Sequence, residues 1–228
     1  MTANGLSDIV AAPFQWAAAL RGRRVFHPVG VLAAGRIERL APRDQGLPIT
    51  SCEVVARVSK AAGTPDALPD VVGLAWKMPP DAFPPTGWDV LLASTGSALL
   101  TRVGLRPVTS WSGVSLSSLM PLRYQQQSWW IRARLITEIR DRGVSLESIR
   151  NNLDDGGILF AIEQACGAGQ FELVAQLTLD RPLPADDGHD VVFDPTIHSP
   201  QEVKLAPGWL TDLRRRAYDR SRDGRDSE

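Results

Sequence analysis

Arg24-Val-Phe-His27-Pro-Val-Gly30-Val-Leu-Ala-Ala-Gly35 is the stretch from which the fold of this chain can be worked out. It belongs to a run from residue 25 to residue 40 that has an extended pattern, rich in Val, Leu and Ile. Gly30 and Gly35 interrupt this run. Glycine inside a strand usually marks a bulge, a bend or a close approach of another backbone. The stretch therefore predicts a strand that bends or is crowded by a neighbour.

Further strands are predicted along the rest of the chain. The segments that alternate or carry short apolar runs are Glu53–Ser59, Val71–Met78, Trp88–Ser94, Ser128–Glu138, Ile158–Gln164 and Phe171–Leu183. With the first run, this gives about seven strands at short spacing and helices near the two ends. Such a series favours an α+β fold, in which an antiparallel β-barrel of about eight strands is flanked by helices.

The helical segments are less regular than the strands. Asp8–Arg21 reads as an amphipathic helix, and Ser145–Asn152 as a helical turn. A short helix is expected within Ser115–Tyr124, and residues 185–198 read as a loop rich in Asp and Pro. We expect a single domain over residues 1–228, with an N-terminal helical arm (1–22), a barrel (23–183) and a C-terminal helix (207–225).

Leu213-Arg-Arg-Arg-Ala-Tyr-Asp-Arg-Ser-Arg-Asp-Gly-Arg225 gives the first indication of chemistry. At about 100° per residue, Arg214, Tyr218 and Arg225 fall within roughly 40° of one another on a helix. Burying a neutral phenol between two cations costs free energy, whereas the ionised phenolate is stabilised by them. Tyrosinate is one of the few proximal ligands of haem iron. The alternative is a solvated basic helix, which is what most charge runs are.

Composition limits the class of protein. The net charge is −1, so no global basic field points to nucleic acid. Cys52 and Cys166 lack metal-ligand spacing, which favours free thiols in a cytoplasmic protein. We see neither a signal-peptide pattern nor an apolar run of about 18 residues, and so expect no membrane partner. Self-association into a homo-oligomer is plausible from the early helix and the seven Trp.

Several motifs together resemble the haem catalases, in the order found in that family. The stretch from Arg24 to Gly35 resembles the distal-histidine segment, and Val55–Gly63 the arginine-containing strand that follows it. Asp70–Met78 and Trp88–Leu91 continue the resemblance. Arg214, Tyr218 and Arg225 have the spacing of the proximal helix, especially that of the smaller members. The core pattern is also similar to that of allene oxide synthases.

The resemblance implies haem b held between the barrel and the C-terminal helix. Tyr218 would then be the iron ligand, as a phenolate. Arg214 would lower the pKa of the phenol, and Arg225 would support the site from the same helix face.

On the opposite haem face, the resemblance implies that His27 moves a proton between the two peroxide oxygens. Ser59 would orient His27. Arg24 and Arg57 would pair with the haem propionates, because guanidinium geometry suits a carboxylate. Without the resemblance, a lone histidine is more often structural, and these two arginines would be assigned to the surface.

The sequence departs from the family where an asparagine helps to hold peroxide, because Ala93 and Ser94 occupy those positions. Losing a preorganised donor commonly costs about 2–4 kcal/mol of transition-state stabilisation. We therefore expect a peroxidase-like reaction with hydrogen peroxide or an organic hydroperoxide, in a response to oxidative stress, more than efficient catalase activity. The alternative is a non-catalytic protein that binds haem or another ligand.

Other polar residues are assigned ordinary roles. Asp70 and Asp89 are expected to cap turns. His189 and His198 have no carboxylate or Cys partner at ligand spacing, so both are expected to be solvated.

Overall fold

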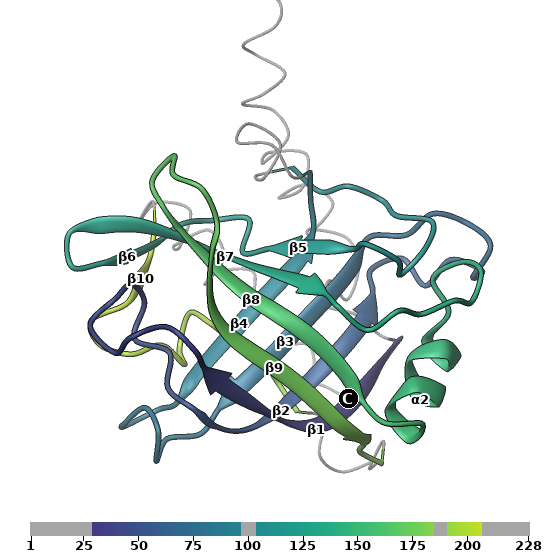
Figure 1. Cartoon of the computed structure of the whole chain (residues 1–228), viewed down its shortest axis with the longest axis horizontal. Helices are drawn as coiled ribbons and strands as arrows, with labels where there is room; N and C mark the ends of the chain where they lie inside the picture. The colour runs from purple at the N-terminus through teal and green to yellow at the C-terminus, as the bar shows by residue number, and fades with distance from the viewer. Residues whose placement is uncertain (1–28, 97–103, 185–190, 207–228) are drawn as a thin grey trace, which may run out of the picture.

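The seven predicted strands, together with one short strand that was not predicted, pair into a closed antiparallel barrel of eight strands (Figure 1). The computed structural model describes residues 29–96, 104–184 and 191–206. Around the ring, the barrel strands are β7 (Gln127–Leu135), β5 (Ser115–Ser117), β4 (Trp88–Ser94), β3 (Val72–Met78), β2 (Cys52–Lys60), β1 (Val29–Arg39), β9 (Glu172–Pro182) and β8 (Ile158–Cys166). The pairing of β8 with β7 closes the ring, which leaves no exposed sheet edge between these eight strands.

Two short strands and one helix complete the described elements. β6 (Leu122–Tyr124) pairs with β7, and β10 (Lys204–Leu205) pairs with β6. Helix α2 (Leu146–Asp154) packs against β9 and β1 at one end of the barrel (Figure 1). Ser145 caps it by accepting the backbone N–H groups of Glu147 and Ser148.

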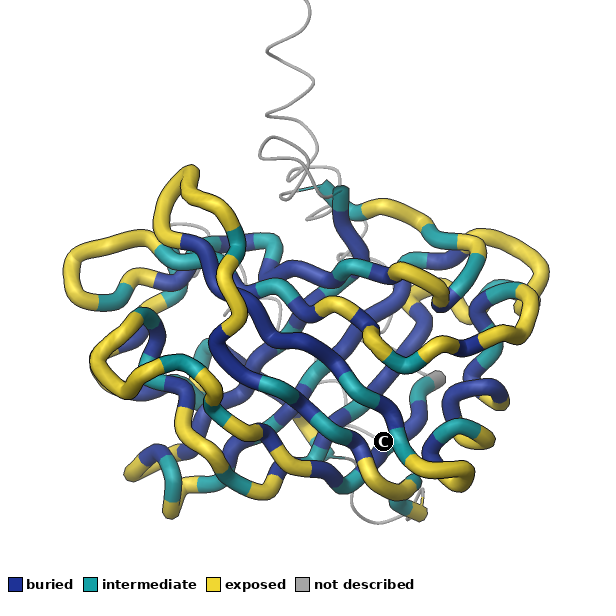
Figure 2. Tube along the Cα trace, viewed as in Figure 1, coloured by how far each residue is buried: buried dark blue, intermediate teal, exposed yellow. Residues whose placement is uncertain are grey.

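The barrel interior is filled by apolar side chains from alternate positions of each strand. Ala56 pairs with Ala33 and Trp76 with Val90, and all four are buried. Figure 2 shows the buried residues along the strands and the exposed ones mainly in the connections at the barrel ends. Because the side-chain period is two, the remaining strand positions face the outside of the barrel.

Arg39 organises one end of the barrel. Its guanidinium donates hydrogen bonds to five backbone carbonyls of the β1–β2 connection, those of Ala41, Pro42, Gln45, Leu47 and Ile49. The same connection is tied to β8, since the N–H of Leu47 donates to Oε1 of Gln164 at 2.9 Å. Leu47 and Ile49 are thereby held in the core, at 0% and 1% exposure.

Both glycines of the first strand have the role expected of them. The register of β1 against β9 shifts between Ala34 and Gly35, and a Cβ on Gly35 would lie 2.2 Å from the carbonyl oxygen of Thr178. A Cβ on Gly30 would lie 3.0 Å from Cγ of Arg57. Gly35 therefore combines two of the roles that the sequence left open, a bulge and a close backbone approach, whereas the register at Gly30 is regular.

The helix expected within Ser115–Tyr124 is wrong. This segment forms β5 and β6 instead, with a tight turn at Leu119, whose φ is 58°. Each strand has three residues, too few to show a periodicity, and both are fixed by pairing with β7.

Two predicted segments lie outside the described residues: the N-terminal helical arm (1–22) and the C-terminal helix (207–225). None of the helices in the described part of the chain has the length and apolar character needed to cross a membrane.

Candidate ligand-facing surface on the outside of the barrel

One line of cross-strand partners runs around the outside of the barrel and contains three of the positions singled out in the sequence, Gly30, Ser59 and Ala93. We call it the outer row; its members, each paired with the next, are Gly30, Ser59, Gly73, Ala93, Ser117 and Arg132. Between Ser59 and Ser117 the row contains no side chain larger than a methyl group. Three strand spacings make this flat part about 14 Å wide.

Arg57 and Ser59 are the two predicted site residues that the structure describes. Both lie on β2 and face outward, and their cross-strand partners are Leu32 and Gly30 on β1. Ser59 is buried, at 3% exposure. The Arg57 guanidinium lies 5.5 Å from the centre of the Phe193 ring, a cation–π contact. The structure thus brings an arginine and a serine together on the face that also carries Ala93.

Residues 191–206, which we call the strap, are fastened to this outer face through Asp89. The Asp89 side chain is fully buried, and its carboxylate accepts bonds from Nζ of Lys77 at 2.7 and 2.8 Å. The strap supplies the backbone N–H of Asp194 at 2.7 Å and Nδ1 of His198 at 2.8 Å, both to Oδ2. The N–H of Asp89 also donates to the carbonyl of His198. A buried carboxylate with this many partners is a strong anchor.

This anchor corrects two of the expected roles. His198 has a carboxylate partner after all, since its partly exposed side chain is bonded to the buried Asp89. Asp89 does not cap a turn but holds the strap. The expectation for Asp70 is confirmed: it accepts the N–H groups of Ala62 and Thr64 in the β2–β3 connection. Burial works to raise the pKa of the Asp70 carboxyl, but these hydrogen bonds outweigh it and lower the pKa. His189 lies outside the described residues.

Ala93 and Ser94 face opposite sides of β4. Ala93 is on the outer row, whereas the Ser94 hydroxyl accepts the N–H of Val72 and donates to the carbonyl of Arg106 at 2.7 Å. Ser94 is fully buried, and both of its hydrogen-bonding roles are taken. It therefore supplies no donor to the surface over Ala93.

Beyond Ala93, the outer face carries two serines of β5. Among the residues that the structure describes, the hydroxyl oxygens of Ser115 and Ser117 have no hydrogen-bond partner, although both atoms are buried. The arginines opposite them on β7 bond elsewhere: Nε of Arg132 and a terminal nitrogen of Arg134 donate to Glu163, at 2.6 and 3.3 Å. Sequence reasoning missed Ser117, because its neighbour Ala93 precedes it by 24 positions in the chain.

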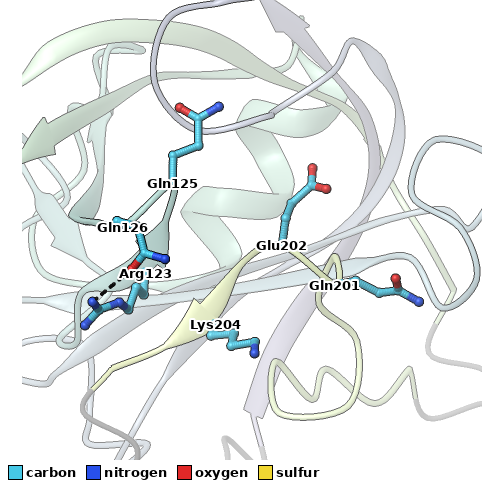
Figure 3. A pocket seen from close by; sticks show the side chains of 6 residues that line it. All are labelled: Arg123, Gln125, Gln126, Gln201, Glu202 and Lys204. Carbon is cyan, nitrogen blue, oxygen red and sulfur yellow. Dashed lines mark hydrogen bonds between the residues drawn. The ribbon is translucent and has the colours of Figure 1, made fainter.

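A hollow of about 370 Å³ lies elsewhere, beside the β6–β7 turn and β10 (Figure 3). It is lined by Arg123, Gln125, Gln126, Gln201, Glu202 and Lys204. All six residues are exposed, and none belongs to β1–β4. An open, polar hollow of this kind offers no buried wall to a flat apolar ligand.

The remaining predicted site residues are Arg24, His27, Arg214, Tyr218 and Arg225, and all of them lie outside the described residues. Their roles stay predictions. No protein-family model and no curated protein matches this sequence.

Proposed function

We propose that this chain is a small haem b protein that reacts with hydrogen peroxide or an organic hydroperoxide. The observation that carries the proposal is the flat part of the outer row between Ser59 and Ser117. Its width of about 14 Å suits one face of a planar macrocycle, and Gly73 and Ala93 carry no side chain larger than a methyl group.

The residues beside the flat part of the outer row are also suited to haem. The next line of outward partners runs from Leu32 through Arg57 and Ala75 to Leu91, so apolar side chains flank one arginine. A guanidinium at the margin of an apolar surface is suited to a propionate. Arg24 would supply a second such contact.

In this proposal, Tyr218 would bind the iron on one face of the haem, and His27 would move the proton on the other face. Bound haem supplies the iron at which the O–O bond of a peroxide is cleaved. Tyr218 would bind the iron as a phenolate, kept ionised by Arg214 and assisted by Arg225. His27, oriented by Ser59, would take the proton from one peroxide oxygen and give it to the other.

A second function is favoured by the environment of Ala93. Alanine offers no hydrogen-bond donor, and the hydroxyl of Ser94 is engaged with Val72 and Arg106. A chain with this surface could bind haem without rapid turnover. In that case the protein would be a haem-binding protein on a barrel scaffold.

The first experiment is an absorption spectrum of the full chain, expressed with a haem precursor and purified by size. We expect a Soret band with the charge-transfer bands of ferric haem ligated by tyrosinate. Tyr218→Phe should abolish haem retention, and Tyr124→Phe is the matched control because the chain has only two tyrosines. A colourless protein that also takes up no haem in titration would overturn the proposal.

Peroxide separates the enzyme from the binder. In the enzyme, His27→Ala should retain haem but slow the reaction with peroxide by 10²–10⁴-fold, the usual contribution of a positioned acid–base group. Ala93→Asn should raise turnover, since it restores a donor on the outer row. Haem binding with no peroxide reaction in any of these proteins would favour the non-catalytic function.

A further inference from the structure

Ser117 combines burial with an unused hydroxyl. The residue is 1% exposed, and among the described residues Oγ has no hydrogen-bond partner. Buried hydroxyls are normally paired, because leaving one unpaired costs the folded protein free energy. A bound ligand that accepts a hydrogen bond from Ser117 would satisfy this hydroxyl.

The register of β5 sets the direction of this hydroxyl. Leu116 pairs with Ala133 among the inward positions, so Ser117 faces outward, between Ala93 on one side and Arg132 on the other. Arg132 is committed to Glu163, and its guanidinium stacks at 4.0 Å from the centre of the Phe171 ring. Ala93 is only half-buried, so the surface opens one strand away from the hydroxyl.

We propose that Ser117 is a ligand-binding residue whose Oγ–H donates a hydrogen bond to a small oxygen ligand or anion held over Ala93. The assignment rests on the proposed function, in which that ligand is a peroxide at the haem. Within the described part of the outer row, Ser59 and Ser117 then provide one hydroxyl at each end of the flat surface. Ser117 thereby supplies a donor beside the position at which Ala93 supplies none.

A binding role predicts opposite effects on stability and on ligand affinity. Ser117→Ala removes an unpaired buried hydroxyl, so the haem-free variant should be at least as stable as the wild type. The same variant should bind a hydrogen-bond-accepting ligand more weakly. A purely structural serine would not produce this combination.

The test uses the full chain, haem-loaded and in the ferric state, with fluoride as the probe. Fluoride is a small anion that accepts hydrogen bonds, and its dissociation constant is measured by optical titration. We expect Ser117→Ala to weaken fluoride binding about tenfold at unchanged haem occupancy, as expected for one hydrogen bond to a charged acceptor. The urea midpoint of the haem-free variant should not fall.

Ser115→Ala is the matched control. Ser115 lies on the same strand, has an equally unpartnered hydroxyl and faces outward, but it pairs with Arg134 and not with Ala93. Its removal should leave fluoride binding unchanged. Equal weakening in both variants, or none in Ser117→Ala, would overturn the assignment while leaving the haem proposal intact. A wild-type chain that takes up no haem would overturn both.

Discussion

Nδ1 of His198 lies 2.8 Å from Oδ2 of Asp89, although the two residues are 109 positions apart in the chain. Asp89 also accepts bonds from Lys77 and from the N–H of Asp194. A single carboxylate thus joins β3, β4 and the strap, the last described segment before the tyrosine-bearing residues 207–228.

Replacing this carboxylate should loosen the strap. We expect Asp89→Asn to lower the free energy of unfolding by about 2–4 kcal/mol, because the buried network loses its negative charge and one of its two acceptor oxygens. Urea unfolding at neutral pH measures the loss, and limited proteolysis should show faster cleavage within residues 191–206. Glu53→Gln is the control: its ion pair with Arg36 is exposed, so it should change stability by less than about 1 kcal/mol. Equal losses in the two variants would contradict the assigned role of Asp89.

Gly35 should tolerate no side chain. Gly35→Ala would place a Cβ 2.2 Å from the Thr178 carbonyl oxygen, a backbone atom that moves only if β1 and β9 separate. We expect a loss of about 2–3 kcal/mol in the free energy of unfolding, at the upper end of overpacking effects. Gly30→Ala would place a Cβ 3.0 Å from Cγ of the flexible Arg57 side chain and 3.1 Å from the Val58 carbonyl oxygen, contacts that small shifts relieve, and should cost about 1 kcal/mol. The reverse order would mean that the bulge does not hold the two strands in contact.

The lowered pKa of Asp70 should make the free energy of unfolding depend on pH in the acid range. Burial works to raise the pKa of its carboxyl, but the N–H groups of Ala62 and Thr64 lower it below the ordinary value of 3.8. Near and below pH 4 the unfolded chain therefore binds more protons at this group than the folded chain, and stability falls as the pH drops through the folded pKa. In urea titrations between pH 2.5 and pH 6, Asp70→Asn should be destabilised at pH 6 and lose part of the acid-dependent slope. An unchanged slope would contradict this prediction.

The two thiols should differ in reactivity. Burial, followed by the neighbouring Glu53 charge, raises the pKa of the Cys52 thiol to about 11, so at pH 8 only about 0.1% is thiolate. Cys166 is exposed. Titration with a chromogenic disulfide reagent should show one fast thiol and one slow thiol in the native protein, and two fast thiols in urea. Cys166→Ser should remove the fast phase; a fast phase that persists would show that Cys52 is accessible.

The barrel could be predicted from sequence where strands are long enough to show a period. Within the predicted strand Ser128–Glu138, polar and apolar residues alternate from Ile131 to Leu135. The structure places β7 (Gln127–Leu135) there with Arg132 and Arg134 facing outward, and the strand ends three residues before the predicted end. β5 and β6 could not be predicted in this way, because strands of three residues depend on their neighbours and not on a local pattern.

The site was predictable only in part, for a related reason. Arg57 and Ser59 were selected from the resemblance to the haem catalases, and their roles stay predictions. The structure shows that they share the outer face of the barrel, because they lie two positions apart on one strand. The contacts of Asp89 with His198, and of Ala93 with Ser117, depend on how distant segments pair. Such contacts follow from tertiary structure, and no spacing along the chain reveals them.

The closure of the barrel also bears on the way in which the chain acquires its fold during synthesis. β1 pairs with β9 from Ala33 opposite Pro182 to Arg39 opposite Ala175, so the first barrel strand receives its second partner only after most of the chain has emerged from the ribosome. Until then, one edge of β1 is open to pairing with other chains. Contacts of such long range are also formed slowly. The growing chain therefore has a prolonged period of exposure, in which chaperones that cover strand edges would have their greatest effect.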